Sequence, residues 1–234
     1  MTDGQFQLFS FDAYLFDIDG TLANTSGRVH YESFHTALRE VYGCDARIDN
    51  VPVHGNTDPG ILRATLMQNH QLPADFEARL PRAYRIMCDE VARNADAMEV
   101  KLCPAIPELL SELRRRGKLI GVVTGNLEPV GWRKLERGGI RDFFDIGSFS
   151  DKHEKREDIF RHGIELARQL RGPLTTVCFV GDTPNDVRAA AHVSTPVIAV
   201  ATGIYSCEQL AKESPTVCVS TCEELFAGQT ITRT

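Results

Sequence analysis

The chain has 234 residues, of which 42% are hydrophobic and 25% are charged, and its formal net charge is −6 at pH 7. This composition is typical of a soluble globular protein, and no stretch approaches the roughly 18 consecutive apolar residues that a membrane-spanning helix needs. The acidic balance argues against a nucleic-acid surface, because polyanion binding depends on clustered Lys and Arg.

Short apolar runs rich in β-branched and aromatic residues predict five strands. In chain order they are "AYLFDID", "KLIGVVTGN", "TVCFVGD", "TPVIAVATG" and "TVCVST". Helical patterns connect them, among them "PAIPELLSELRRRG" and "IFRHGIELARQLRG". Strands that alternate with helices imply right-handed crossovers and a parallel sheet covered on both faces. The sequence therefore predicts an α/β protein with a Rossmann-like core formed by residues 1–23 and 101–234.

Residues 24–100 interrupt this alternation. They lack a strong strand pattern and show helical spacing in "GRVHYESFHTALREVYG", "DPGILRATLMQN" and "DFEARLPRAYRIMCDEVARNA". So long a helical stretch between two core strands predicts an inserted, all-helical domain.

Three of the predicted strands end on polar residues. The first ends in Asp17 and Asp19, the second in Thr124-Gly125-Asn126, and a later one in "GDTPNDV", which contains Asp182 and Asp186. Ligands of open parallel sheets bind at the carboxyl ends of the strands, so these groups are expected to share one crevice. Carboxylates packed together repel one another, and an all-oxygen site without clustered His or Cys suits Mg²⁺. Asp17, Asp19, Asp182 and Asp186 are the predicted metal ligands.

A carboxylate beside a hard cation at a strand end favours phosphoryl transfer with the carboxylate as nucleophile. Asp17 is the predicted nucleophile, and Asp19 is the predicted acid and base that serves the leaving group and then water. Thr124 is predicted to donate a hydrogen bond to the phosphate. The other predicted phosphate- or substrate-binding residues are Gly20, Thr21, Gly125 and Asn126.

These motifs resemble the haloacid dehalogenase superfamily, and most closely its phosphoglycolate-phosphatase-like branch with a helical C1-type cap. "DIDGTL" at 17–22 matches the first motif, "VVTGN" at 122–126 the second and "GDTPNDV" at 181–187 the fourth. The resemblance implies a nucleophilic Asp17, a Mg²⁺ cofactor, and a cap formed by residues 24–100. "HGNTDPGIL" at 54–62 resembles a cap segment of this branch.

The third motif departs from the family pattern, which has a Lys followed by Pro. Here the corresponding stretch reads "SFSDKHEKREDIF". Lys152, Lys155 and Arg156 are all candidates for the cation that neutralises the nucleophile and the phosphate. Spacing favours Lys155 or Arg156, and the forked guanidinium of Arg156 is the better match for holding a carboxylate and a phosphate together.

The resemblance implies a Mg²⁺-dependent phosphomonoesterase that hydrolyses a small phosphorylated metabolite through an aspartyl phosphate. The alternatives are a β-phosphoglucomutase-like phosphotransferase, a haloacid dehalogenase and a non-catalytic binding module. Five polar residues lie near cap segments that could face the site: Arg28, His30, His54, Asn56 and Asp58. The first 16 residues lack the features of a secretory signal, so we expect a cytoplasmic protein. We also expect a monomer or homodimer with no membrane or nucleic-acid partner.

Overall fold

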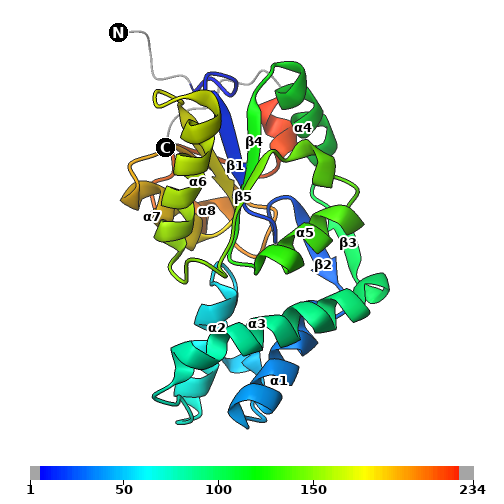
Figure 1. Ribbon diagram of the computed structural model, residues 1–234. Coiled ribbons are helices and arrows are strands. Elements are labelled where there is room, and N and C mark those ends of the chain that lie inside the picture. The colour runs from blue at the N-terminus through cyan, green and yellow to red at the C-terminus, as the bar shows by residue number, and fades with distance from the viewer. Residues whose placement is uncertain (1–5, 227–234) are drawn as a thin grey trace.

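A six-stranded parallel sheet forms the centre of the computed structural model, which describes residues 6–226 (Figure 1). Its strands are β1 (Ala13–Phe16), β4 (Leu119–Val123), β5 (Ile146–Ser148), β6 (Val177–Gly181), β7 (Val197–Val200) and β8 (Val217–Val219). They are arranged in the order β5-β4-β1-β6-β7-β8, so the first strand of the chain lies in the middle. The predicted α/β core with a parallel sheet is confirmed.

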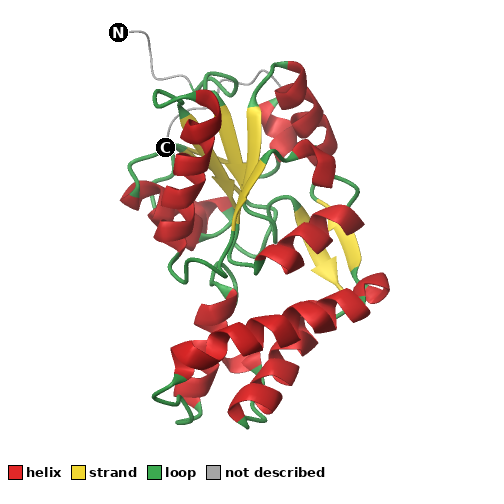
Figure 2. Ribbon diagram, in the orientation of Figure 1, coloured by secondary structure: helices red, strands yellow, loops and turns green. Residues whose placement is uncertain are grey.

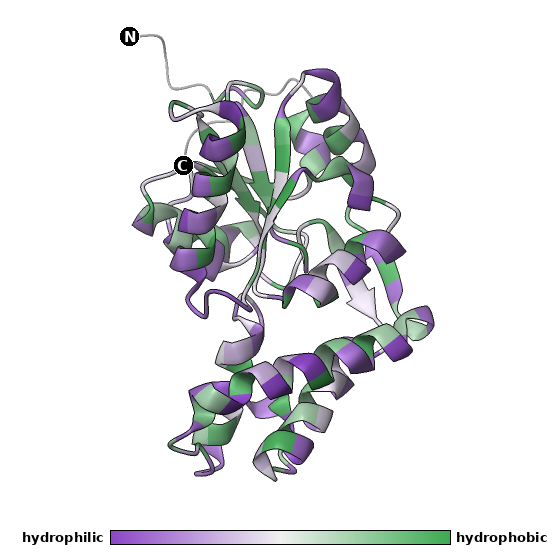
Figure 3. Ribbon diagram, viewed as in Figure 1, coloured by the Kyte–Doolittle hydropathy of each residue, from purple (hydrophilic) through white to green (hydrophobic). Residues whose placement is uncertain are grey.

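The sheet is buried on both faces, as the continuous apolar runs predict. Tyr14 and Phe16 of β1 pack on one face, against α4 (Ile106–Arg115). Ala13 and Leu15 pack on the other face, in a cluster that includes α6 (Arg156–Arg171), α7 (Pro184–His192) and α8 (Cys207–Ala211). Figure 2 shows helices on either side of the strands, and Figure 3 shows that hydrophobic residues are concentrated along the strands between them.

A two-stranded antiparallel ribbon connects the core with the inserted segment. It pairs β2 (Ala23–Ser26) with β3 (Glu99–Leu102), and the predicted division after residues 23 and 100 falls within it. The ribbon strands are short and alternate between more buried and exposed residues, so they carry little of the apolar signal by which strands are predicted. The insertion is therefore helical between the ribbon strands, not over its whole length as expected. The exact domain boundaries stay a prediction.

Three helices and a 3₁₀ turn (Ile48–Asn50) make up most of the insertion, which we call the cap. They are α1 (Val29–Tyr42), α2 (Asp58–Gln68) and α3 (Phe76–Arg93), and they lie beyond the carboxyl edge of the sheet in Figure 1. The cap has its own apolar cluster, to which α5 of the core (Glu128–Arg137) contributes Leu127 and Val130 at its start. Among residues 6–226, no helix combines the length and the apolar character needed to cross a membrane.

Candidate active site

The polar residues that follow β1, β4 and β6 lie side by side because these three strands are neighbours in the sheet. Asp17, Thr124 and Asp182 each come directly after their strand, and all three line one cavity of about 330 Å³ between the core and the cap. Gly20 turns the chain here with φ of 84°. A Cβ at this position would lie 2.2 Å from Oδ2 of Asp182, so glycine is required both by the backbone conformation and by this close approach.

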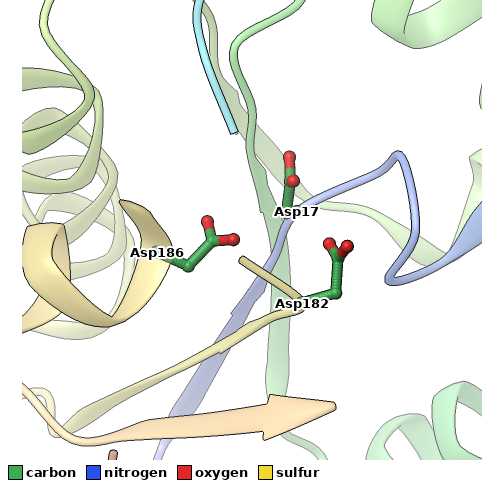
Figure 4. Close-up of side chains that lie close together, drawn as sticks. All are labelled: Asp17, Asp182 and Asp186. Atoms are coloured by element: carbon green, nitrogen blue, oxygen red, sulfur yellow. The ribbon is translucent and has the colours of Figure 1, made fainter. Parts of the chain in front are cut away.

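Three carboxylates form a buried acidic group at the strand ends. Asp17, Asp182 and Asp186 each offer an oxygen, and these oxygens lie within 4.8 Å of one another; Figure 4 shows the three side chains around a common space. Burial raises the pKa of Asp17 to about 6, and the charge of Asp186 adds to the rise, while Arg156 acts in the opposite direction. Burial and repulsion by Asp186 and Asp17 also raise the pKa of Asp182 well above its usual range. An oxygen-only group that resists ionisation fits a hard divalent cation.

Arg156 is the cation that contacts the predicted nucleophile. Its Nη2 lies 2.8 Å from Oδ2 of Asp17 and 2.5 Å from Oδ1 of Asp186, and its Nε donates to the same Asp186 oxygen at 2.9 Å. The guanidinium is buried at the first residue of α6. It therefore links the carboxylate at the end of β1 to the one in the first turn of α7.

Both oxygens of Asp186 already have partners in the protein. Oδ1 accepts from Arg156, and Oδ2 accepts from the backbone N–H of Thr183 at 3.0 Å and from its hydroxyl at 2.6 Å. Thr183 and Asp186 thus form a capping box at the start of α7, as the sequence "TPND" favours. Asp17 and Asp182 are left as the carboxylates better placed to hold a metal, with Asp186 positioning Arg156.

Asp19, also expected among the metal ligands, has its carboxylate outside this acidic group. The Nζ of Lys134 lies 2.8 and 2.6 Å from its two oxygens, and Nδ2 of Asn126 donates to it at 2.8 Å. The ammonium also donates to Oδ1 of Asn126 at 2.8 Å. Burial acts to raise the pKa of Asp19, but Lys134 and Asn126 outweigh it and lower that pKa below its ordinary value. Lys134 belongs to α5 and is nearly fully buried, and it is not among the residues predicted from the sequence.

Two other predicted residues have different positions from those expected. Thr21 is fully buried and its hydroxyl donates to Oδ1 of Asp182 at 2.9 Å, so it orients that carboxylate and does not face the phosphate site. Lys155 is exposed and lines a separate cavity of about 390 Å³. It is the N-cap residue of α6, in extended conformation, and the next residue, Arg156, is the one that points to Asp17. Lys152 is exposed as well.

The remaining phosphate-site candidates lie in the loop after β4. The Thr124 hydroxyl accepts from Nδ2 of Asn126 at 2.8 Å, and both residues are buried and line the cavity. Gly125 approaches the cap so closely that a Cβ would lie 2.2 Å from the Asn56 carbonyl oxygen. This loop is therefore enclosed by the cap on one side and by the acidic group on the other.

Polar contacts between the cap and the core occur at the start of α2. The backbone N–H of Asp58 donates to the Gly125 carbonyl, and Oδ2 of Asp58 accepts from the N–H of Leu127, both at 2.8 Å. Arg63 forms two bonds of 2.6 and 2.7 Å with the carboxylate of Glu154. All five polar cap residues singled out in the sequence line the cavity: Arg28, His30, His54, Asn56 and Asp58.

The family follows from comparison with known proteins. Residues 14–200 match the model of haloacid dehalogenase-like hydrolases, and this match spans most of the chain. The chain belongs to the haloacid dehalogenase-like hydrolase family. The predicted family resemblance is thereby confirmed, and the protein is a hydrolase by family.

Curated relatives of this hydrolase share a quarter to a third of its residues. It is 26% identical to a probable phosphatase, IndB, of Dickeya dadantii, with 92% of this chain and 91% of the relative covered. It is 25% identical to a phosphoglycolate phosphatase of Agrobacterium fabrum (81% and 80% covered). It is 31% identical to the tyrosine-protein kinase PtkA of Mycobacterium tuberculosis, covering 87% of this chain and 66% of that protein.

Among solved structures, the hydrolase fold is similar to CbbY from Rhodobacter sphaeroides, a mutant of which was crystallised in complex with xylulose-(1,5)bisphosphate. The TM-score is 0.71 at 21% identity, with 95% of this chain and 99% of CbbY covered. This likeness shows that the two chains share the fold of core and cap.

Proposed function

We propose that the protein is a Mg²⁺-dependent phosphomonoesterase that works through an aspartyl phosphate. The observation that carries the proposal is the position of Asp17. Its carboxylate lies at the end of β1, faces the cavity, touches the Arg156 guanidinium and belongs to a buried group of three carboxylates. The names of the phosphatase relatives support the same reaction.

Asp17 and Asp182 would hold the metal. When bound, Mg²⁺ would neutralise negative charge on the phosphate and on the carboxylates around it. Arg156 supplies a second positive charge beside Asp17, where the transferred phosphoryl group would sit, and stabilises charge there with a donor already in position. The Thr124 hydroxyl and the backbone N–H of Gly125 would be further donors to phosphate oxygens.

The reaction needs two displacements at phosphorus. In the first, an Asp17 oxygen bonds to phosphorus, the ester P–O bond breaks, and protonated Asp19 gives its proton to the leaving alkoxide. In the second, water attacks the phosphorus of the aspartyl phosphate, Asp19 takes a proton from that water, and Asp17 leaves as a carboxylate. Asp19 ends the cycle protonated again, so the proton count closes.

Lys134 has a clear role in the second displacement. It lowers the pKa of Asp19 and so favours the ionised form that acts as base. The first displacement needs the protonated form, and a substrate bound as its monoanion supplies that proton, because the second pKa of a phosphate ester is about 6. The proton that Asp19 takes from water in the second displacement then leaves with the phosphate, so Asp19 returns to its ionised form.

The test compares wild type with Asp17→Asn on p-nitrophenyl phosphate and a small panel of alkyl phosphate esters, in Mg²⁺ and in EDTA. We expect phosphate release that requires Mg²⁺ and is lost in Asp17→Asn. The matched control is Asp158→Asn, which makes the same chemical change on the outer surface of α6, where Asp158 pairs with Arg161. A folded, Mg²⁺-loaded wild type without turnover on any ester would refute the proposal.

Phosphoryl transfer to an acceptor other than water is the second candidate. The cap lies against the loop after β4, where the Asp58 N–H binds the Gly125 carbonyl, and a cap that excludes water from an aspartyl phosphate favours another acceptor. The relative named as a tyrosine-protein kinase points in the same direction. Transfer would be recognised by incorporation of phosphate into an added alcohol or sugar phosphate in place of free phosphate.

A dehalogenase has no need of the acid at Asp19 or of the acidic group, and a binding module needs neither.

A further inference from the structure

The cavity of about 330 Å³ has two chemically different ends. One end is formed by the carboxylates and the loop after β4. The other end lies against the cap and the core loop after β7, where apolar side chains share the lining with the polar cap residues named above. The apolar side chains are Val29, Phe34, Ile48, Val53, Ile61 and Ile204. A substrate with its phosphorus at Asp17 would place its leaving group toward this end.

Ile204 is the member of this set that the packing of the fold does not explain. Its side chain is 60% exposed, in the loop that brings Gly203 next to Asp182, whereas isoleucine is among the residue types most often buried. It lines the cavity from the core, while the aromatic rings of Tyr31 and Phe34 line it from the cap. Apolar residues thus line the cavity from both domains.

Most basic side chains that line the cavity already face carboxylates. Lys134 binds Asp19, Arg156 binds Asp17, His30 lies 3.2 Å from Asp58, and the exposed Arg28 pairs with Glu32 while stacking on Tyr31. His54 is the fifth basic residue of the lining. A leaving group that carries its own carboxylate would lose hydration on entering, and among the described basic residues of the lining it would find only His54 without a carboxylate already beside it.

We propose that the preferred substrates are phosphate monoesters of an uncharged alcohol with an aromatic or branched apolar body, in preference to esters of a small hydroxy acid such as phosphoglycolate. The inference rests on the proposed phosphatase function and adds the substrate class to it. The cavity volume lies near the lower end of the range of about 300–1,000 Å³ that small-molecule sites span, so it suits one ring or a short branched chain.

The test compares kcat/KM for 2-phenylethyl phosphate and for phosphoglycolate. Both esters release an alkoxide, so the comparison reports the fit of the leaving group and not its chemical reactivity. We expect 2-phenylethyl phosphate to be favoured by at least about tenfold, which is the discrimination that one or two methylene-sized apolar contacts provide.

A charge introduced in the cavity lining sharpens this test. Ile204→Lys places an ammonium among the apolar side chains of the lining and should reduce the ratio of the two kcat/KM values by about tenfold. Leu174→Lys makes the same change at a residue that is 91% exposed and precedes β6, at the opposite edge of the sheet, and should leave the ratio unchanged.

Three outcomes would overturn the inference. In the first, phosphoglycolate is the better substrate and His54→Ala loses that preference. In the second, Ile204→Lys changes the ratio of the two kcat/KM values no more than Leu174→Lys does. In both cases the phosphatase function itself would stand. If neither ester nor p-nitrophenyl phosphate were hydrolysed, the proposed function would fail and the substrate class with it.

Discussion

The ammonium of Lys134 lies 2.6 and 2.8 Å from the two carboxylate oxygens of Asp19 and 2.8 Å from the side-chain oxygen of Asn126. A nearly fully buried lysine from α5 thereby fixes the residue proposed as acid and base, and the same contact holds the loop after β4 in place. We regard Lys134 as a positioning residue that acts through Asp19.

Replacing Lys134 by Met keeps the length of the side chain and removes its charge. We expect kcat to fall about a hundredfold, which is the lower end of what general acid–base catalysis contributes. The ammonium lowers the pKa of Asp19, so its loss raises that pKa, and the acid limb of the kcat–pH profile should move to higher pH. A purely structural role would lower the melting temperature without moving the profile. The control is Lys212→Met, at an exposed residue directly after α8.

Arg156→Lys tests whether the forked guanidinium is needed. Arg156 reaches Asp17 and Asp186 at once through Nη2 and Nε, and a single ammonium cannot reproduce that planar arrangement. Loss of one charge-assisted hydrogen bond, worth about 1.5–3 kcal/mol, should lower kcat/KM about tenfold to a hundredfold.

Lys155→Met is the matched control for this variant, because Lys155 is adjacent in sequence but exposed. Its kcat/KM should stay within about twofold of wild type, as for surface changes away from a site. An equal loss of activity in both variants would contradict the assignment of Arg156 as the cation beside Asp17.

The acidic group should destabilise the metal-free protein at neutral pH. The pKa of Asp17 is raised to about 6 in the folded state, against about 3.9 for an unperturbed Asp, so the folded state binds more protons between these values. The free energy of unfolding therefore falls as pH rises through this window. In EDTA, this group should make the melting temperature lower at pH 7 than at pH 5, and excess Mg²⁺ should reduce the difference.

Asp182→Asn separates this effect from other titrations. The variant removes one of three crowded charges and keeps an oxygen that can accept from Thr21, so we expect a higher melting temperature than wild type in EDTA at pH 7 and no gain from Mg²⁺. Thermal melts at pH 5, 6 and 7 with EDTA or Mg²⁺ measure both quantities. A variant that melts below wild type in EDTA at pH 7 would show that repulsion in this group is not what limits stability.

The contact between cap and core should be sensitive to Arg63. Its guanidinium forms two bonds with Glu154 across the boundary, in partly buried surroundings, so Arg63→Gln should weaken closure of the cap. We expect kcat/KM to fall about threefold to tenfold. The kcat/KM of wild type should also depend more strongly on salt concentration than that of the variant. Arg93→Gln is the control, because Arg93 is exposed and pairs only within the cap, with Glu90. Steady-state kinetics at low and high ionic strength would measure the difference, and equal behaviour of the two variants would contradict it.

Much of the core was predictable because its signals are local. An apolar run that ends in Asp17 specifies a buried strand with a carboxylate at its end, and the same holds for the strands before Thr124 and Asp182. By contrast, β5 was missed: it has only three residues, one of them glycine, and it lies at the edge of the sheet, where few residues need to be apolar.

The sequence by itself determined which residue types end the strands of the sheet, because burial on both faces requires unbroken apolar runs and leaves the polar residues conspicuous. Only the tertiary structure decided what those residues touch. In the sequence, Lys134 is one of several charged residues of an amphipathic helix. In the folded protein its ammonium contacts the Asp19 carboxylate. Thr21 lies in the same loop as Gly20, but its hydroxyl donates to Asp182. At the start of α6, Arg156 contacts Asp17, whereas the adjacent Lys155 does not. Lys155 has an extended backbone and Arg156 is the first helical residue, so adjacent side chains point in different directions, and contacts of this kind depend on the three-dimensional path of the chain and not on spacing in the sequence.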